Sequence, residues 1–135
     1  MIPCVPSYPP FGRCPRKRIK PKVIGCLIEV HRHLGPGYLE SIYKRAACIE
    51  LQLRGIPFEV EHPISVIYKG EPIVGHRLDL LVDRRLIVEL KAVSHLEPVH
   101  ASQLVSYLTA CNLRSGLLVN FNVGILKNGL KRIVR

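Results

Sequence analysis

The segment GHRLDLLVDRRLIVELKAV, residues 75–93, contains two strongly apolar runs that a short charged loop separates. The runs, residues 73–82 and 86–93, have the composition of buried strands, and Asp83-Arg84-Arg85 forms the turn between them. Charged side chains nevertheless stand inside both runs, namely Asp79, Glu89 and Lys91. We expect a central β-hairpin that helices cover on at least one face.

The short turn fixes the register of this hairpin. Val82 then faces Leu86, and counting back along both strands places Asp79 opposite Glu89. Directly opposed side chains have Cβ atoms about 4.5 to 5.5 Å apart, so two carboxylates there repel each other unless a cation lies between them. Lys91 follows Glu89 by two residues and shares its face. Two acids and one ammonium group therefore converge.

Charged groups inside buried strands are costly unless they are paired or coordinated. One explanation is Mg²⁺, which binds one or two carboxylates together with waters and phosphate oxygens, and which lowers the pKa of bound water. Lys91 would then orient the attacking water or stabilise developing negative charge. The other explanation is an ion-paired cluster in which Lys91 and Arg77 neutralise the two acids without a metal. Spacing alone leaves both explanations open.

Three other segments have the periodicity of amphipathic helices. The first helix ends at Gly35-Pro36-Gly37. The second helix has the expected core stripe Leu39, Ile42, Ala46, Ile49 and Leu53. Glu40, Tyr43 and Lys44 lie off that stripe. The third helix follows Pro98, and its expected core residues are Ala101, Leu104, Leu108 and Cys111, whereas His100, Gln103 and Tyr107 share a polar face.

Strands are expected on both sides of the hairpin, at residues 58–68, 116–121 and 130–134. Pro63 suggests that the first of these is an edge strand or is bent. The expected order of elements is therefore ααβββαββ, without an internal repeat. This order predicts an α/β (α+β) fold with a central mixed sheet flanked by helices.

Length, charge and proline content limit the organisation of the chain and its partners. Residues 1–21 contain six of the 11 prolines and no apolar periodicity, so we expect a disordered basic arm followed by one domain at residues 22–135. The net charge of +10 favours polyanionic partners, either nucleic acid or an anionic membrane. No window is apolar enough for a membrane-spanning helix and no secretory signal is present, so we expect a soluble, cytoplasmic protein.

The pattern D-x9-E-x-K on a hairpin flanked by helices resembles the PD-(D/E)XK nuclease superfamily, which has a restriction-endonuclease-like core. More specifically, residues 37–43, GYLESIY, resemble the motif of the GxxExxY family, a group of small prokaryotic proteins within that superfamily. The segments EVHRHLGPGYLESIY, QLVSYL and LLVNFNV are also similar in order and spacing, so the resemblance covers residues 22–135. Leu78 stands where the superfamily motif has a proline, but that position does not touch the chemistry.

The resemblance implies a nuclease, that is, a phosphodiesterase dependent on Mg²⁺ or Mn²⁺, with DNA the favoured substrate and RNA still open. It implies that Asp79 and Glu89 bind the metal and that Lys91 assists the nucleophile. Glu40 would complete metal binding or hold a metal-bound water, although by itself it could simply favour the N-terminus of its helix. Gln103 and Tyr107 are spaced like a QxxxY element that approaches the site or the phosphate backbone, although they could equally form a hydrogen-bonded polar helix face.

Two other functions remain open on the same fold. One is a non-catalytic nucleic-acid-binding module that acts with a partner protein, and metal-independent binding would favour it. The other is a protein-interaction module with a vestigial site, against which the complete set of Asp79, Glu89, Lys91 and Glu40 argues. A homodimer would allow so small a domain to span a duplex or to cut both strands.

Overall fold

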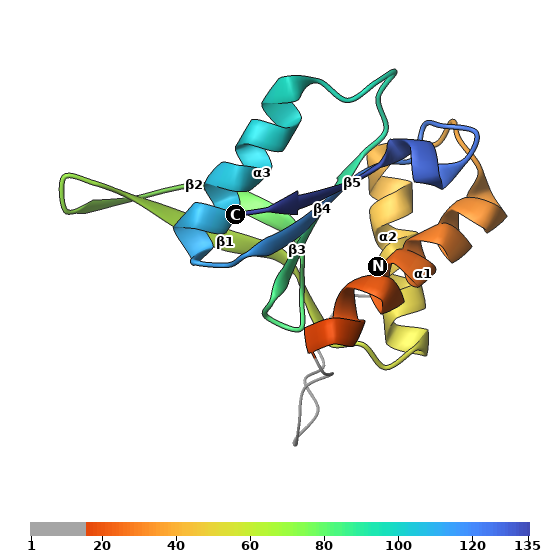
Figure 1. Cartoon of the computed structure of the whole chain (residues 1–135), viewed down its shortest axis with the longest axis horizontal. Coiled ribbons are helices and arrows are strands. Elements are labelled where there is room, and N and C mark those ends of the chain that lie inside the picture. The colour runs from red at the N-terminus through yellow and green to blue at the C-terminus, as the bar shows by residue number, and fades with distance from the viewer. Residues whose placement is uncertain (1–15) are drawn as a thin grey trace.

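The computed structural model of the chain describes residues 16–135, with side chains from Ile19 onward, and its elements follow the expected order (Figure 1). The helices are α1 (Arg16–Leu34), α2 (Glu40–Leu53) and α3 (Pro98–Cys111). The strands are β1 (Phe58–Tyr68), β2 (Glu71–Val82), β3 (Leu86–Lys91), β4 (Ser115–Asn120) and β5 (Leu130–Val134). A short 3₁₀ helix, η1 (Leu126–Gly129), leads into β5.

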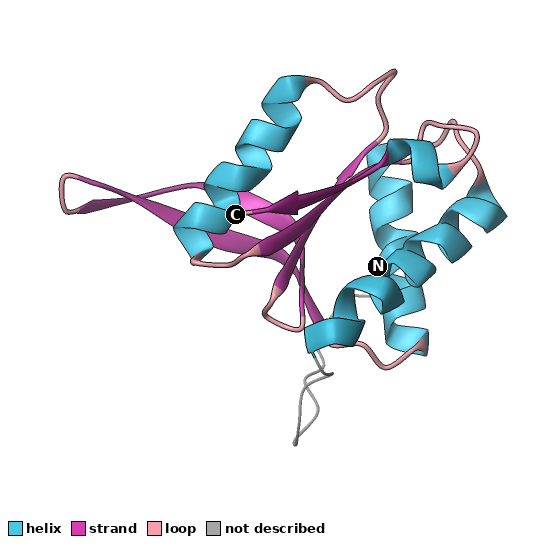
Figure 2. Ribbon diagram, in the orientation of Figure 1, coloured by secondary structure: helices cyan, strands magenta, loops and turns pink. Residues whose placement is uncertain are grey.

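The strands form one mixed sheet in the order β1-β2-β3-β4-β5. β3 and β4 are parallel because α3 connects them as a crossover helix, whereas the other neighbouring pairs are antiparallel. Helices α1 and α2 cover one face of the sheet and α3 covers the other (Figure 2). The predicted mixed sheet flanked by helices, with its restriction-endonuclease-like arrangement, is therefore confirmed.

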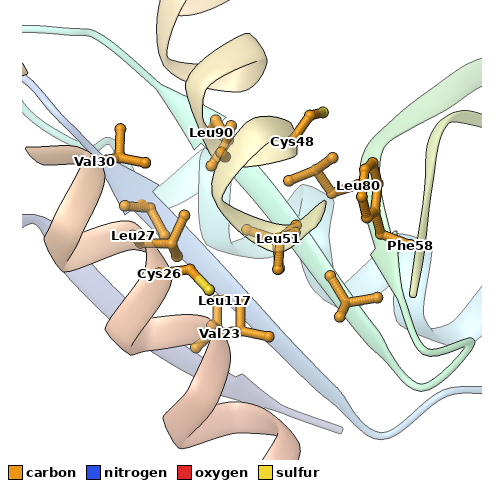
Figure 3. Close-up of a cluster of buried hydrophobic side chains, with 14 of the residues drawn as sticks. Val23, Cys26, Leu27, Val30, Cys48, Leu51, Phe58, Leu80, Leu90 and Leu117 are labelled. Atoms are coloured by element: carbon orange, nitrogen blue, oxygen red, sulfur yellow. The ribbon is translucent and has the colours of Figure 1, made fainter. Parts of the chain in front are cut away.

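Two hydrophobic cores lie on the two faces of the sheet. In the larger one, α1 and α2 pack against the sheet through residues that Figure 3 labels, among them Val23, Leu27, Leu51, Phe58, Leu80, Leu90 and Leu117. In the smaller one, Leu104 and Leu108 of α3 pack against Leu81, Ile87 and Leu118. Both faces of β3 are thus buried, which explains why its sequence, LIVELK, is apolar except at Glu89 and Lys91.

α1 begins upstream of the expected domain boundary. The prolines predicted an arm that extends to residue 21, yet residues 16–21 are helical and Pro21 lies inside α1. Ile19 is only 5% exposed and belongs to the larger core. Its burial helps to offset the backbone hydrogen bond that Pro21 cannot donate. α1 therefore begins before the boundary expected at residue 22, and residues 1–15 of the expected arm lie outside the described residues.

α2 buries a different face from the predicted one. Its buried residues are Tyr43, Ala47, Cys48 and Leu51. The predicted stripe is largely exposed, at 75% for Leu39, 44% for Ile42, 49% for Ile49 and 76% for Leu53. Both sides of the helix are apolar, so periodicity alone could not distinguish them. At about 100° per residue, Glu40 and Lys44 lie on the same side as Ala47 and Leu51, and the corrected face turns them toward the sheet.

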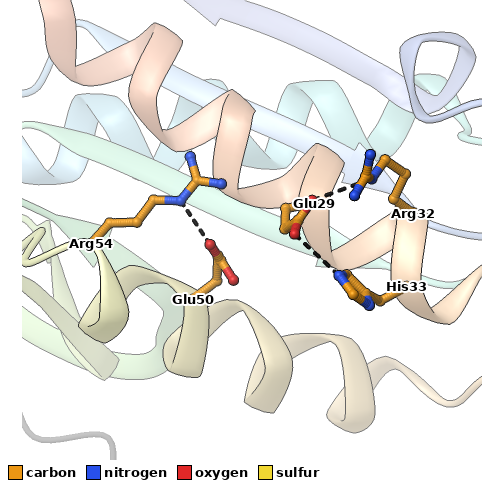
Figure 4. Close-up of polar contacts among 5 residues, drawn as sticks. All are labelled: Glu29, Arg32, His33, Glu50 and Arg54. Carbon is orange, nitrogen blue, oxygen red and sulfur yellow. Dashed lines mark hydrogen bonds and ion pairs between the residues drawn. The ribbon is translucent and has the colours of Figure 1, made fainter.

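Ion pairs lie on α1 and at the end of α2 (Figure 4). Within α1, Glu29 pairs with Arg32 at 3.2 Å and with His33 at 3.1 Å. At the end of α2, Glu50 pairs with the C-cap residue Arg54 at 2.7 Å, and a Cβ on Gly25 would lie 3.2 Å from Nη1 of Arg54. Such exposed pairs contribute at most about 1 kcal/mol each. Burial against the sheet, rather than these pairs, must therefore hold the helices in place.

β1 and β2 continue beyond the rest of the sheet as a two-stranded hairpin, which we call the β1–β2 hairpin (Figure 1). The register between them shifts at Ile64 and Ser65, directly after Pro63, so the predicted bend in an edge strand is confirmed. β2 pairs with β3 only from Leu80 to Val82. The two strands therefore diverge just before Asp79.

Among the described residues, none of the helices has the length and apolar character needed to cross a bilayer.

Candidate active site

The two predicted acids lie where β2 and β3 diverge, a place that we call the strand fork (Asp79 and Glu89). Val82 pairs with Leu86, as predicted, and continuing this register places the two acids directly after the last pair, Leu80 with Val88. At that point hydrogen bonds from backbone N–H groups to side-chain carboxylates replace the backbone hydrogen bonds between β2 and β3. The Leu90 N–H donates to Oδ2 of Asp79 at 2.9 Å, and the Asp79 N–H donates to Oε1 of Glu89 at 3.2 Å. Each carboxylate is thereby anchored to the opposite strand.

Glu89 is a buried acid whose ionisation is opposed by its surroundings. It is 5% exposed. Burial, followed by the charge of Asp79, raises the pKa of Glu89 from 4.5 to about 8. Lys91 acts in the opposite direction but does not outweigh these effects. At neutral pH the strand fork therefore favours a positive partner, either a proton or a cation.

Glu40 reaches this site from the first residue of α2. Burial, and next the charge of Asp79, raise the pKa of Glu40, while Lys91 and Lys44 lower it. Glu40 is therefore within electrostatic range of all three residues. Its place in the first turn also suits the helix dipole, because the N-cap residue Leu39 makes no side-chain capping bond. The two explanations predicted for Glu40 are thus compatible.

Lys44 is the cation that pairs with the strand fork, and the sequence analysis did not assign it. Its Nζ lies 3.6 Å from Oδ1 of Asp79 and also bonds to Glu61 of β1. Although burial lowers it, the pKa of Lys44 is raised overall by the hydrogen bond to Glu61. Among the described residues, neither Lys91 nor Arg77 forms an ion pair with the two acids. The available signal was the spacing of Lys44, one helical turn after Glu40 on the same side.

α3 contributes Tyr107 from the other face of the sheet. Tyr107 is half-buried, and burial, followed by the charges of Glu89 and Asp79, raises its pKa. Its ring stacks on His76 of β2, with ring centroids 4.1 Å apart and an interplanar angle of 14°. The position of His76 in the sequence had suggested no role for it. Tyr107 therefore lies within electrostatic range of both acids of the strand fork.

Gln103 and His100, the other two residues of that polar face, differ in their surroundings. Gln103 is exposed on α3, one turn before Tyr107. Nδ1 of His100 accepts a hydrogen bond from the Glu97 N–H at 3.0 Å and completes a capping box at the start of α3. His100 therefore stabilises the helix end.

Tyr43 and Phe121 connect the two halves of the site, and we call this contact the Tyr43–Phe121 brace. The buried Tyr43 hydroxyl donates to the Gly35 carbonyl at 2.5 Å and accepts from the Tyr38 N–H at 3.2 Å. The Tyr43 ring stacks on Phe121, with centroids 4.4 Å apart and an angle of 7°. The Phe121 N–H donates to the Lys91 carbonyl at 2.9 Å. The brace thus joins the start of α2 to the end of β3.

Asn120 fixes the chain that follows Lys91. It is 1% exposed at the end of β4. Its Oδ1 accepts from the Val93 N–H at 3.0 Å, and its Nδ2 donates to the Val93 carbonyl at 2.9 Å. The sequence signal was an amide inside the apolar run LLVNFNV, although its partner is a backbone that no sequence pattern reveals.

The donor set at the strand fork suits a hard divalent cation. The acids offer only oxygen ligands, which are the ligands that Mg²⁺ and Mn²⁺ prefer. Burial, followed by the charge of Asp79, raises the pKa of Glu89, and the opposing charge of Lys91 does not cancel these effects. Within residues 16–135, no three His, Cys, Asp or Glu side chains are grouped closely enough to hold an ion. The protein itself therefore offers two carboxylates, as Mg²⁺ sites completed by water and phosphate often do.

A comparison with protein families agrees with this geometry. Residues 17–133 match the family model described as the PD-(D/E)XK nuclease superfamily. The matched segment includes the strand fork, Glu40, α3, strands β1 to β4 and all but the last residue of β5. No curated protein and no solved structure matches the chain.

Proposed function

Because the chain belongs to the PD-(D/E)XK nuclease superfamily, we propose that it is a metal-dependent nuclease that hydrolyses phosphodiester bonds at the strand fork. The observation that carries this proposal is the buried pair of Asp79 and Glu89, in which the pKa of Glu89 is raised to about 8. A buried acid pair of this kind is costly for stability, and a site that binds a cation gives a reason to keep it. Lys91 follows the pair on the same strand.

The residues of the site have distinct roles in this proposal. Asp79 and Glu89 would hold Mg²⁺ or Mn²⁺, which supplies Lewis-acid activation of the phosphodiester and of water. The Lys91 ammonium group stabilises the negative charge that develops on the phosphoryl oxygens. Glu40 accepts a proton from the attacking water, a task that its raised pKa favours. The water oxygen bonds to phosphorus as one ester P–O bond breaks, and the leaving oxygen takes up a proton.

Contacts to the substrate come from α3 and from the basic surface. Tyr107 lies beside the acids, and Gln103 precedes it on the exposed side of α3, so both can donate hydrogen bonds to phosphate oxygens. The net charge of +10 favours any nucleic acid through counterion release. We propose DNA as the substrate and the GxxExxY family as the subfamily, with a prokaryotic, cytoplasmic setting. A homodimer or a partner protein would supply the second half of a duplex-spanning enzyme.

One observation favours a second candidate, a non-catalytic nucleic-acid-binding module. Lys44 lies 3.6 Å from Asp79 and so offsets part of the acidic charge without a metal. Such a module would bind nucleic acid equally well in the presence and absence of a divalent cation.

The test is cleavage of labelled single-stranded, double-stranded and branched DNA, and of RNA, in Mg²⁺, Mn²⁺ or EDTA. We compare the wild type with Asp79→Asn and Lys91→Met. The matched controls are Glu71→Gln and Lys69→Met, which remove one negative and one positive charge at the exposed turn between β1 and β2. We expect each site variant to lose about a hundredfold or more of the metal-dependent rate, while the controls keep theirs.

Two outcomes would contradict the nuclease proposal. Cleavage that persists unchanged in both site variants would come from other residues or from a contaminant. Nucleic-acid binding without metal-dependent cleavage, in wild type and controls alike, would establish the binding module instead.

A further inference from the structure

A second group of cations surrounds a cavity at the opposite end of β3 from the strand fork. The cavity has a volume of about 350 Å³ and lies between α1, the β2–β3 turn and the loop that joins α3 to β4. We call it the basic cavity, defined by its polar lining residues Lys20, Arg85, Asn112, Arg114 and Ser115. β3 separates it from Lys91 by five residue steps of about 3.3 Å, or about 17 Å. It is therefore distinct from the candidate active site.

The charge of the basic cavity is strongly one-sided. Three of its lining residues are cationic, and none of the described residues that line it is acidic. Arg85 is largely withdrawn from solvent, with a side-chain exposure of 12%, and pairs with the buried Asp83 of the same turn. Lys20 and Arg114 come from different elements and have no ion pair among the described residues. Like charges that converge on one cavity repel each other, and an anion between them would remove that repulsion.

The loop that carries Arg114 is held in place before any ligand binds. The Arg135 N–H donates to the Arg114 carbonyl at 2.9 Å, and the Arg135 guanidinium donates to Oδ1 of Asn112 at 2.9 Å. Asn112 ends α3 in the left-handed conformation, with a φ of 54°. The N–H groups of Asn112 and Leu113 bond to carbonyls of the last turn of α3. Those carbonyls are therefore occupied, and little ordering is needed on binding.

The lining chemistry selects a phosphate attached to a flat or apolar group. Guanidinium groups bind phosphate through paired hydrogen bonds, and an ammonium group adds a point charge. Asn112 and Ser115 offer neutral hydrogen-bonding groups, and Leu86 and Leu113 form an apolar wall. A volume near 350 Å³ lies at the lower end of small-molecule sites. We propose that the basic cavity binds the phosphate of one nucleotide unit, either a free nucleotide or part of a nucleic acid chain.

The nucleic acid source rests on the proposed function, whereas the phosphate site itself does not. We would measure binding to the full chain in EDTA, using 5′-AMP by calorimetry and a labelled 12-nucleotide DNA by fluorescence anisotropy. Lys20→Ala and Arg114→Ala should each weaken binding about tenfold, the loss expected for one charge-assisted hydrogen bond. The controls Lys69→Ala and Arg32→Ala remove the same charges from exposed sites elsewhere and should change binding less than about twofold.

The pattern of binding identifies the source of the phosphate. Binding of 5′-AMP that Lys20→Ala and Arg114→Ala weaken indicates a free nucleotide, whereas binding of the DNA alone, with the same two losses, indicates a nucleic acid chain. No binding, or equal losses in all four variants, would overturn the proposal. Asp79→Asn should keep this binding. If no form of the protein cleaves nucleic acid while the cavity still binds phosphate, only the proposed nuclease function fails.

Discussion

Replacing Tyr43 with phenylalanine removes one hydroxyl group from the Tyr43–Phe121 brace while keeping the stacked ring. The Gly35 carbonyl and the Tyr38 N–H both lose a partner, at 2.5 and 3.2 Å respectively. A typical hydrogen bond contributes about 0.5 to 1.5 kcal/mol, so the free energy of unfolding should fall by about 1 to 3 kcal/mol. Urea denaturation followed by far-UV circular dichroism measures this change. Tyr68→Phe removes a hydroxyl from a ring that is 61% exposed, and serves as the control.

The same substitution tests whether the brace positions Glu40. The loop that Tyr43 holds leads directly into the first residue of α2. If the proposed nuclease function is correct, Tyr43→Phe should lower kcat about tenfold with little change in KM, because a small displacement of a proton acceptor affects the transition state more than binding. In a Glu40→Gln background it should have no further effect on kcat. Unchanged stability, or full additivity of the two substitutions in kcat, would refute the reasoning.

Three further predictions concern the strand fork and its supports. In EDTA, the folded protein holds a proton on Glu89 up to about pH 8 whereas the unfolded chain releases it near pH 4.5, so the free energy of unfolding should fall as pH rises between these values. Glu89→Gln should remove that decline in urea titrations at about pH 5, 7 and 9, and an equal decline in both proteins would contradict this. Gly129→Ala places a Cβ 2.1 Å from the Asn120 carbonyl oxygen and should destabilise the protein by about 1 to 3 kcal/mol, seen as a lower melting temperature. The control is Gly124→Ala, where nothing lies within 4 Å of the added Cβ. Equal melting temperatures of the two variants would show that β4 moves to accommodate the methyl group without cost. Lys44→Met removes a positive charge beside Asp79 and should tighten Mn²⁺ binding severalfold in calorimetry, whereas weaker binding would mean that Lys44 organises the site rather than competing with the metal.

The hairpin could be predicted in detail because its turn allows only one register that buries the apolar residues. Val82 pairs with Leu86, and the two acids follow from that single pairing. What the register could not show is that the ladder stops at Leu80. Beyond it the carboxylates bond to backbone N–H groups of the opposite strand.

The orientation of α2 was mispredicted for a physical reason that also hid a site residue. Its two sides are almost equally apolar, so the hydrophobic pattern has no single solution. The stacking of Tyr43 on Phe121, at 4.4 Å, comes from a residue 78 positions further along the chain and favours one side. Because the buried side of α2 is the opposite of the predicted one, Lys44, to which no role was assigned, lies beside Asp79 as its ion-pair partner. Glu40 and Tyr107 were proposed as site residues only through motif resemblance, because neither stands out by spacing alone.

The charges gathered at the strand fork explain how a metal and a proton would compete there. Four carboxylates, Glu40, Glu61, Asp79 and Glu89, surround two ammonium groups, Lys44 and Lys91, so full ionisation leaves an excess of two negative charges. A proton on Glu89, whose pKa is about 8, reduces that excess to one at neutral pH. A divalent cation would instead cancel it. Metal binding must then displace the proton, and metal affinity should rise with pH until about pH 8 and level off above it.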